Sequence, residues 1–87
     1  MRNIHNIFTD VLSNYKRLKY IILEDCALSE TTHKYLIFIH LNNQLNKYFM
    51  VELLYYKDTD SIAGSLLENH INYGVVERFM NELIDAC

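Results

Sequence analysis

Histidine is the side chain in this sequence best suited to hold a metal ion or to transfer a proton near neutral pH, and the chain has four. His33 and His40 lie seven residues apart in one apolar segment, and an odd spacing along a strand places two side chains on opposite faces. His5 and His70 fall in separate segments with helical patterns, and neither has a partner at an HxxxH or HxxE spacing. The pattern predicts no metal site and no cofactor.

The segment Asp58-Thr59-Asp60-Ser61 resembles the first half of a calcium-binding loop. Such a loop needs an oxygen ligand at its fifth position and a glycine at its sixth. Ile62 and Ala63 occupy these positions, so calcium binding is not expected. We expect Asp58 or Asp60 to cap a helix instead, because aspartate is a favoured N-cap residue.

The serine and cysteine side chains lack the surroundings that create a nucleophile. No serine lies in a glycine-flanked elbow, and two glycines are too few for a phosphate-binding loop. Cys26 and Cys87 form no CxxC pair, and we expect an apolar filler and an exposed terminal thiol. The sequence therefore predicts no catalytic residue and a protein that is not an enzyme.

Hydrophobic periodicity indicates helices at both ends of the chain. Residues 3–16 carry an apolar stripe at helical spacing, with Asn3 as a suitable N-cap and Lys16-Arg17 suited to the negative end of the helix dipole. A short helix is expected from Asp58 or Asp60 to about His70. After a break at residues 72–74, a last helix is expected over residues 75–86.

Three strongly apolar segments between these helices predict strands. They cover residues 18–26, 33–41 and 47–56, and they are rich in aromatic and β-branched side chains. Residues 42–46 contain three asparagines, which tolerate the left-handed backbone of a hairpin turn. The prediction is one α+β domain over residues 1–87, with a three-stranded antiparallel sheet, flanking helices and the order α-β-β-β-α-α.

The second and third expected strands are apolar on both faces. An antiparallel sheet with one wet face should alternate between apolar and polar residues, and these segments do not. Helices on opposite faces of the sheet would bury everything and give an ordinary monomer. Helices too few for both faces would leave an uncovered patch, which usually marks a protein–protein surface and here includes some of Leu36, Phe38, Tyr48, Met50 and Tyr56.

Charge is distributed unevenly along the chain. The net charge is −3, yet residues 1–57 hold seven Lys/Arg against five Asp/Glu, whereas residues 58–87 hold one arginine against six carboxylates. The acidic C-terminal third favours a basic partner, because opposite charge speeds association. The residues expected to bind a protein are Glu68, Glu77, Glu82, Asp85, Tyr48, Met50 and Tyr56.

The order α-β-β-β-α resembles that of double-stranded-RNA-binding domains. The last helix of those domains opens with lysines that grip phosphate, whereas here the last helix carries Glu77, Glu82 and Asp85 with the single Arg78. The nearest basic patch is Lys16-Arg17 with Lys19, and so few cations bind phosphate weakly at physiological salt. We therefore do not expect direct nucleic-acid binding.

The chain also resembles small phage-encoded inhibitors of host defence, including some anti-CRISPR proteins, in size, acidity, single-domain form and element order. That resemblance implies an inhibitor that covers the surface of another protein, itself basic or nucleic-acid-binding. A homodimer is expected. The alternatives are a small nucleic-acid-binding dimer, a toxin-immunity protein or antitoxin, and an adaptor subunit. No stretch reaches about 18 apolar residues and no signal-peptide pattern begins the chain, so we expect no membrane association and a location in the cytoplasm, that of the host if the gene is a phage gene.

Overall fold

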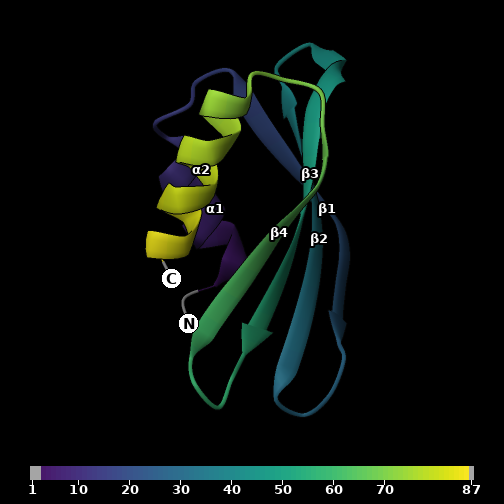
Figure 1. The fold of residues 1–87 in the computed structure, drawn as a ribbon, viewed down its shortest axis with the longest axis vertical. Coiled ribbons are helices and arrows are strands. Elements are labelled where there is room, and N and C mark those ends of the chain that lie inside the picture. Colours follow the sequence, from purple (N-terminus) through teal and green to yellow (C-terminus); the bar gives the residue numbers. More distant parts are fainter. Residues whose placement is uncertain (1–2, 87) are drawn as a thin grey trace.

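The computed structural model describes residues 3–86 and places them in an antiparallel sheet with helices on one side (Figure 1). Each strand is hydrogen-bonded to the next one in the sequence, so the described sheet has the order β1-β2-β3-β4. In chain order the elements are α1 (Ile4–Leu12), β1 (Leu18–Ala27), β2 (Thr32–Leu41), β3 (Gln44–Tyr56), β4 (Ser61–Asn69) and α2 (Tyr73–Asp85). The α+β class and the antiparallel sheet are confirmed, whereas three strands and the order α-β-β-β-α-α are wrong.

Helix α1 begins where the sequence predicts and ends four residues early. The Asn3 side chain accepts a hydrogen bond of 2.8 Å from the backbone N–H of His5, which satisfies one donor of the first turn. At the other end the N–H of Tyr15 donates to the carbonyl of Leu12 at 2.9 Å, a bond to the third preceding residue that tightens and ends the helix. Lys16 and Arg17 therefore lie in the connection to β1.

The three predicted strands are confirmed with small changes at their ends. The turn between β2 and β3 is tighter than expected, because Leu41 pairs with Gln44 and only Asn42 and Asn43 connect them. Asn43 has a φ of 68°, the left-handed conformation that asparagine tolerates in two-residue hairpins. The predicted role of asparagine in this turn is confirmed.

The predicted helix from Asp58 or Asp60 to His70 is wrong, because this segment forms strand β4. It pairs with β3 from Tyr56↔Ser61 to Phe49↔Asn69. Asp60 does not cap a helix; it lies in the hairpin turn with a φ of 49°, and its carboxylate accepts a 2.6 Å hydrogen bond from the hydroxyl of Tyr55. His70 correspondingly follows a strand and is not on a helix.

Gly64 shows why β4 lies where it does. A β-carbon at this position would come within 3.0 Å of the Met80 Cε of α2 and 3.3 Å of the Leu53 Cδ2 of β3. The missing side chain therefore lets α2 approach the sheet at this strand. Glycine is unfavourable in the interior of a helix and of a strand alike, so its presence in β4 reflects this close approach and not a strand preference.

The hydrophobic core lies between the helices and the sheet face that they cover, which we call the inner face. Helix α2 starts at Tyr73, where the side chain of Asn72 accepts a hydrogen bond of 2.8 Å from the N–H of Gly74. The residues predicted as a break therefore form the N-terminus of this helix. Phe79 of α2 contacts both Phe8 of α1 and Phe49 of β3, with ring centroids 6.0 and 5.5 Å apart. The fully buried side chains are Ile7, Phe8, Ile37, Ile39, Phe49, Val51, Leu53, Val76, Phe79 and Leu83.

Candidate interaction surfaces

The sheet face turned away from both helices, which we call the outer face, has no covering layer among residues 3–86 (Figure 1). Side chains alternate between faces along a strand, so the neighbours of the buried inner residues lie on the outer face. Ile21, Phe38 and Met50 occupy register positions next to each other across β1, β2 and β3. The other apolar positions of this face include Leu36, Leu54, Tyr48 and Tyr56. All five residues expected in an uncovered patch are therefore on one face.

Aromatic rings form a continuous row across one end of the outer face. Phe38 stacks on Tyr48, with ring centroids 4.6 Å apart and an angle of 27° between the rings. His40 lies beside Phe38 at 5.6 Å, and His70 beside Tyr48 at 4.7 Å. Offset contacts of this kind stabilise aromatic pairs by about 0.5–1.5 kcal/mol beyond their burial. Phe38 and Tyr48 are partly exposed in this row and His70 is exposed, whereas His40 is buried.

Charged groups of both signs surround the apolar positions. The Lys34 Nζ lies 3.4 Å from the Glu24 Oε2 and 3.9 Å from the Glu52 Oε2, so β1, β2 and β3 are linked by one ammonium group. Glu68 of β4 is the register partner of Met50 and lies on the same face. This face therefore has a mixed charge, unlike the acidic surface of α2.

Glu68, Tyr48 and His70 form a small polar cluster at the edge of the aromatic row. The His70 Nε2 lies 3.1 Å from the Glu68 Oε1. Hydrogen bonds from His70 and then from Tyr48 hold the pKa of the Glu68 carboxyl below its ordinary value. The same Glu68 hydrogen bond raises the pKa of the Tyr48 hydroxyl. The cluster fixes the Tyr48 ring against Phe38.

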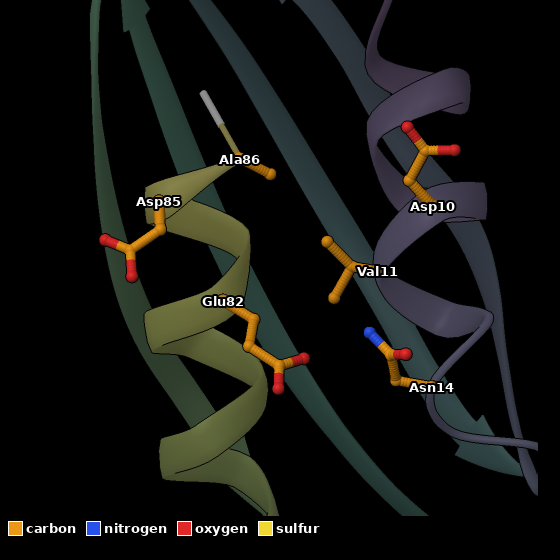
Figure 2. Close-up of a pocket in the computed structure, with 6 residues that line it drawn as sticks. All are labelled: Asp10, Val11, Asn14, Glu82, Asp85 and Ala86. Atoms are coloured by element: carbon orange, nitrogen blue, oxygen red, sulfur yellow. The ribbon is translucent and has the colours of Figure 1, made fainter.

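A second surface lies on the other side of the sheet, where α1 and α2 run beside each other. An open pocket of about 370 Å³ between them is lined by Asp10, Val11 and Asn14 of the α1 side and by Glu82, Asp85 and Ala86 of the α2 side, and the carboxylate of Asp85 points away from α1 (Figure 2). Burial and then the neighbouring Glu82 carboxylate raise the pKa of the Tyr15 hydroxyl. Glu77 is also exposed on α2. The helical layer therefore presents an acidic surface.

The residues predicted to bind a protein are divided between these two surfaces. Glu77, Glu82 and Asp85 lie on the acidic helical surface, whereas Glu68 belongs to the outer face with Tyr48 and Met50. Tyr56 is on the outer face too, but eight residues beyond Tyr48 on β3, which is about 26 Å along a strand. The two surfaces lie on opposite sides of the sheet, so one flat partner surface cannot contact both.

The alternation of residues identifies several outer-face residues that the sequence prediction missed. Ile21 and Lys34 share the face of Phe38 and Met50, and their positions follow from counting in steps of two along each strand once the register is known. His70 had no such signal, because its segment was assigned to a helix. The pairing of β4 with β3 is what places His70 beside Tyr48.

A further group of titratable side chains lies on the inner face near the N-terminus of α1. His33 contacts Asp25, and the Tyr35 ring lies 4.7 Å from that of His33. Burial, and then the Asp25 carboxylate, raise the pKa of Tyr35. His33 and His40 are on opposite faces, as their spacing predicts. Within residues 3–86 no three His, Cys, Asp or Glu side chains are grouped so that they could hold a metal ion.

No protein-family model matches the chain, and neither a curated protein nor a solved structure is significantly similar to it. Neither described helix has the length and apolar character needed to cross a membrane.

Proposed function

We propose that this chain is a non-enzymatic protein-binding module that inhibits another macromolecule by covering part of its surface. The observation that carries this proposal is the placement of both helices on one side of the sheet, which leaves the outer face with Phe38, Tyr48 and Met50 uncovered. Aromatic side chains and methionine are enriched at protein interfaces. These residues support the outer face as a protein-binding surface.

The acidic helical surface supports a basic partner. Glu77, Glu82 and Asp85 are exposed on α2, and Asp10 of α1 adds a fourth carboxylate at the pocket that Glu82 and Asp85 line. An acidic surface of this kind attracts a partner whose own surface is rich in lysine and arginine and raises the association rate. Proteins that bind nucleic acid expose such basic surfaces. The specific form that we propose is an inhibitor that occupies the phosphate-binding surface of a nucleic-acid-binding protein in the cytoplasm.

An anti-CRISPR-like inhibitor encoded by a phage is one member of this class. The described residues form four strands where the sequence predicted three, so the element order no longer supports the resemblance to anti-CRISPR proteins. The resemblance now rests on size, acidity and single-domain form. Toxin-immunity proteins, antitoxins and adaptor subunits act by the same kind of surface contact. The identity of the partner distinguishes among them.

The test compares two double variants. One reverses the charge of two carboxylates on the acidic helical surface, and the other reverses two carboxylates elsewhere on the chain. Glu77→Lys with Asp85→Lys should reduce the capture of a basic protein from a host lysate by immobilised chain, and should slow its measured association rate. Glu30→Lys with Asp58→Lys changes the net charge equally at exposed positions outside the helices and should leave both values near wild type. Equal losses in the two variants would show that net charge, and not the helical surface, governs binding.

One observation favours a second candidate, binding of single-stranded nucleic acid to the outer face. Aromatic rings on an open sheet can stack on bases, and Phe38, Tyr48 and the exposed His70 are arranged in a row there. Glu24, Glu52 and Glu68 on the same face repel phosphate, which ranks this candidate second. A gel shift with labelled single-stranded RNA and DNA at low salt decides it, since retardation that Tyr48→Ala abolishes would place this candidate first.

A further inference from the structure

We propose that the outer face is occupied by a second copy of this chain, so that two sheets pack face to face in a symmetric dimer and the acidic helices point outward on both sides. This inference rests on the proposed function: it takes the outer face as a protein-binding surface, assigns a second copy of this chain to it, and leaves the acidic helical surface for the basic partner. It follows from the charge, the shape and the area of the outer face.

The charge of the outer face fits a copy better than it fits a strongly charged partner. Lys34 on β2 lies between Glu24 on β1 and Glu52 on β3, so both signs are present within the face itself. A symmetric dimer places the same patch on both subunits, which requires a surface that complements itself. The helical surface, with Glu77, Glu82 and Asp85 against the single Arg78, would repel its own copy more than the mixed outer face does.

The register shows how a copy fits. A twofold axis parallel to the strands and between β2 and β3 exchanges these two strands. Because Phe38 and Met50 are register partners, Phe38 of one copy then faces Met50 of the other. Lys34 of one copy then faces Leu54 of the other, its register partner, and lies about 7 Å along the strand from Glu52 of that copy. Sheets that pack in this way stand about 10 Å apart, a gap filled by side chains of this size.

The outer face is also large enough for a stable dimer. Four strands spaced about 4.8 Å apart, with about 3.3 Å per residue, give a plan area of roughly 600 Å² for the face, and the side chains standing on it enlarge the accessible area. Stable interfaces bury about 800 Å² on each partner. An 87-residue chain buries a modest part of its own surface, so a second layer on the outer face adds to its stability.

Sedimentation velocity across a concentration series tests the dimer directly. The wild-type chain should sediment at twice its 10.4 kDa mass, and Met50→Glu should raise the dissociation constant of the dimer at least about tenfold, because each copy would bury an unpaired carboxylate. Leu28→Glu is the matched control, since Leu28 is 57% exposed in the β1–β2 connection and should leave the dimer intact. A wild-type chain that stays monomeric up to 100 µM would overturn the proposal.

A thiol probe needs no substitution on the outer face and so remains informative if Met50→Glu fails to fold. Cys26 is half-buried and is the register partner of Lys34, which places it on the outer face. In a Cys87→Ser variant it is the single thiol, and its alkylation by iodoacetamide should slow at least about fivefold as the chain concentration passes through the dimer range. A rate that does not change with concentration argues against the dimer.

Failure of this proposal is distinguishable from failure of the proposed function. A monomer whose Glu77→Lys/Asp85→Lys variant still loses partner capture overturns the dimer and leaves protein binding by the helical surface in place. A monomer whose Met50→Glu variant loses a captured protein shows that a different protein occupies the outer face, which also overturns the dimer.

Discussion

Phe38 and Tyr48 are diagonal neighbours on adjacent strands, and their rings stack 4.6 Å apart on the sheet face that no helix covers. The direct register partner of Phe38 is Met50, and that of Tyr48 is His40. Diagonal pairs of long side chains still touch across an antiparallel sheet. This contact lies toward one end of the outer face, and it links the stability of the isolated chain to the surface that we propose for binding.

A double-mutant cycle measures the Phe38–Tyr48 contact. Phe38→Ala and Tyr48→Ala should couple by about 0.5–1.5 kcal/mol in the free energy of unfolding, measured by denaturant titration, because each loses the same ring contact. Tyr48→Phe keeps the ring and should retain most of that coupling. The titration should use a concentration at which the chain is monomeric, so that self-association does not enter the result. Additive losses would mean that the two rings do not stack in solution.

Gly64 provides a test of the strand that the sequence did not predict. Gly64→Val should lower the free energy of unfolding by about 1–3 kcal/mol, because the new side chain meets Met80 and Leu53 on the packed inner face. Ser65→Val is the matched control, since Ser65 is exposed and its register partner Glu52 lies on the outer face. Valine favours strands, so Ser65→Val should be neutral or stabilising. If the two valine variants unfold alike, α2 does not pack on β4 as the structure shows.

The lowered pKa of Glu68 predicts how the stability of the folded chain depends on pH in acid. Its pKa is held below the ordinary 4.5, mainly by His70 and then by Tyr48, so the folded state favours the carboxylate. The stabilisation is present above the unfolded pKa and is lost as pH falls through the folded pKa, which places the window below about pH 4.5. A carboxyl titration by NMR should give a midpoint for Glu68 below that value.

Two variants identify the cause of the Glu68 shift. His70→Ala should move the Glu68 midpoint upward more than Tyr48→Phe does, because His70 is the larger of the two causes. A Glu68 midpoint that stays low in both would exclude the cluster as the source.

The identities of the residues by themselves determined the helices at the two ends and three of the strands. Ile4, Ile7, Phe8 and Val11 recur at helical spacing and are buried, and the apolar segments at 18–26, 33–41 and 47–56 form strands. These helices and strands can be predicted from the sequence because their patterns depend only on the types and spacing of residues close together in the chain. The Asn42-Asn43 turn follows in the same way from a backbone preference of asparagine.

The tertiary structure decided the conformation of residues 61–69 and the face on which each helix packs. Ile62 and Leu66 are four apart, a spacing that fits one side of a strand as well as one side of a helix, and only pairing with β3 selects the strand. The close approach of α2 at Gly64 reinforces that choice. The side of the sheet that each helix covers depends on contacts between segments distant in the sequence, such as Phe8 with Phe79, and no local pattern specifies it. Because both helices cover the same face, Phe38, Tyr48 and Met50 form a surface and not a second core.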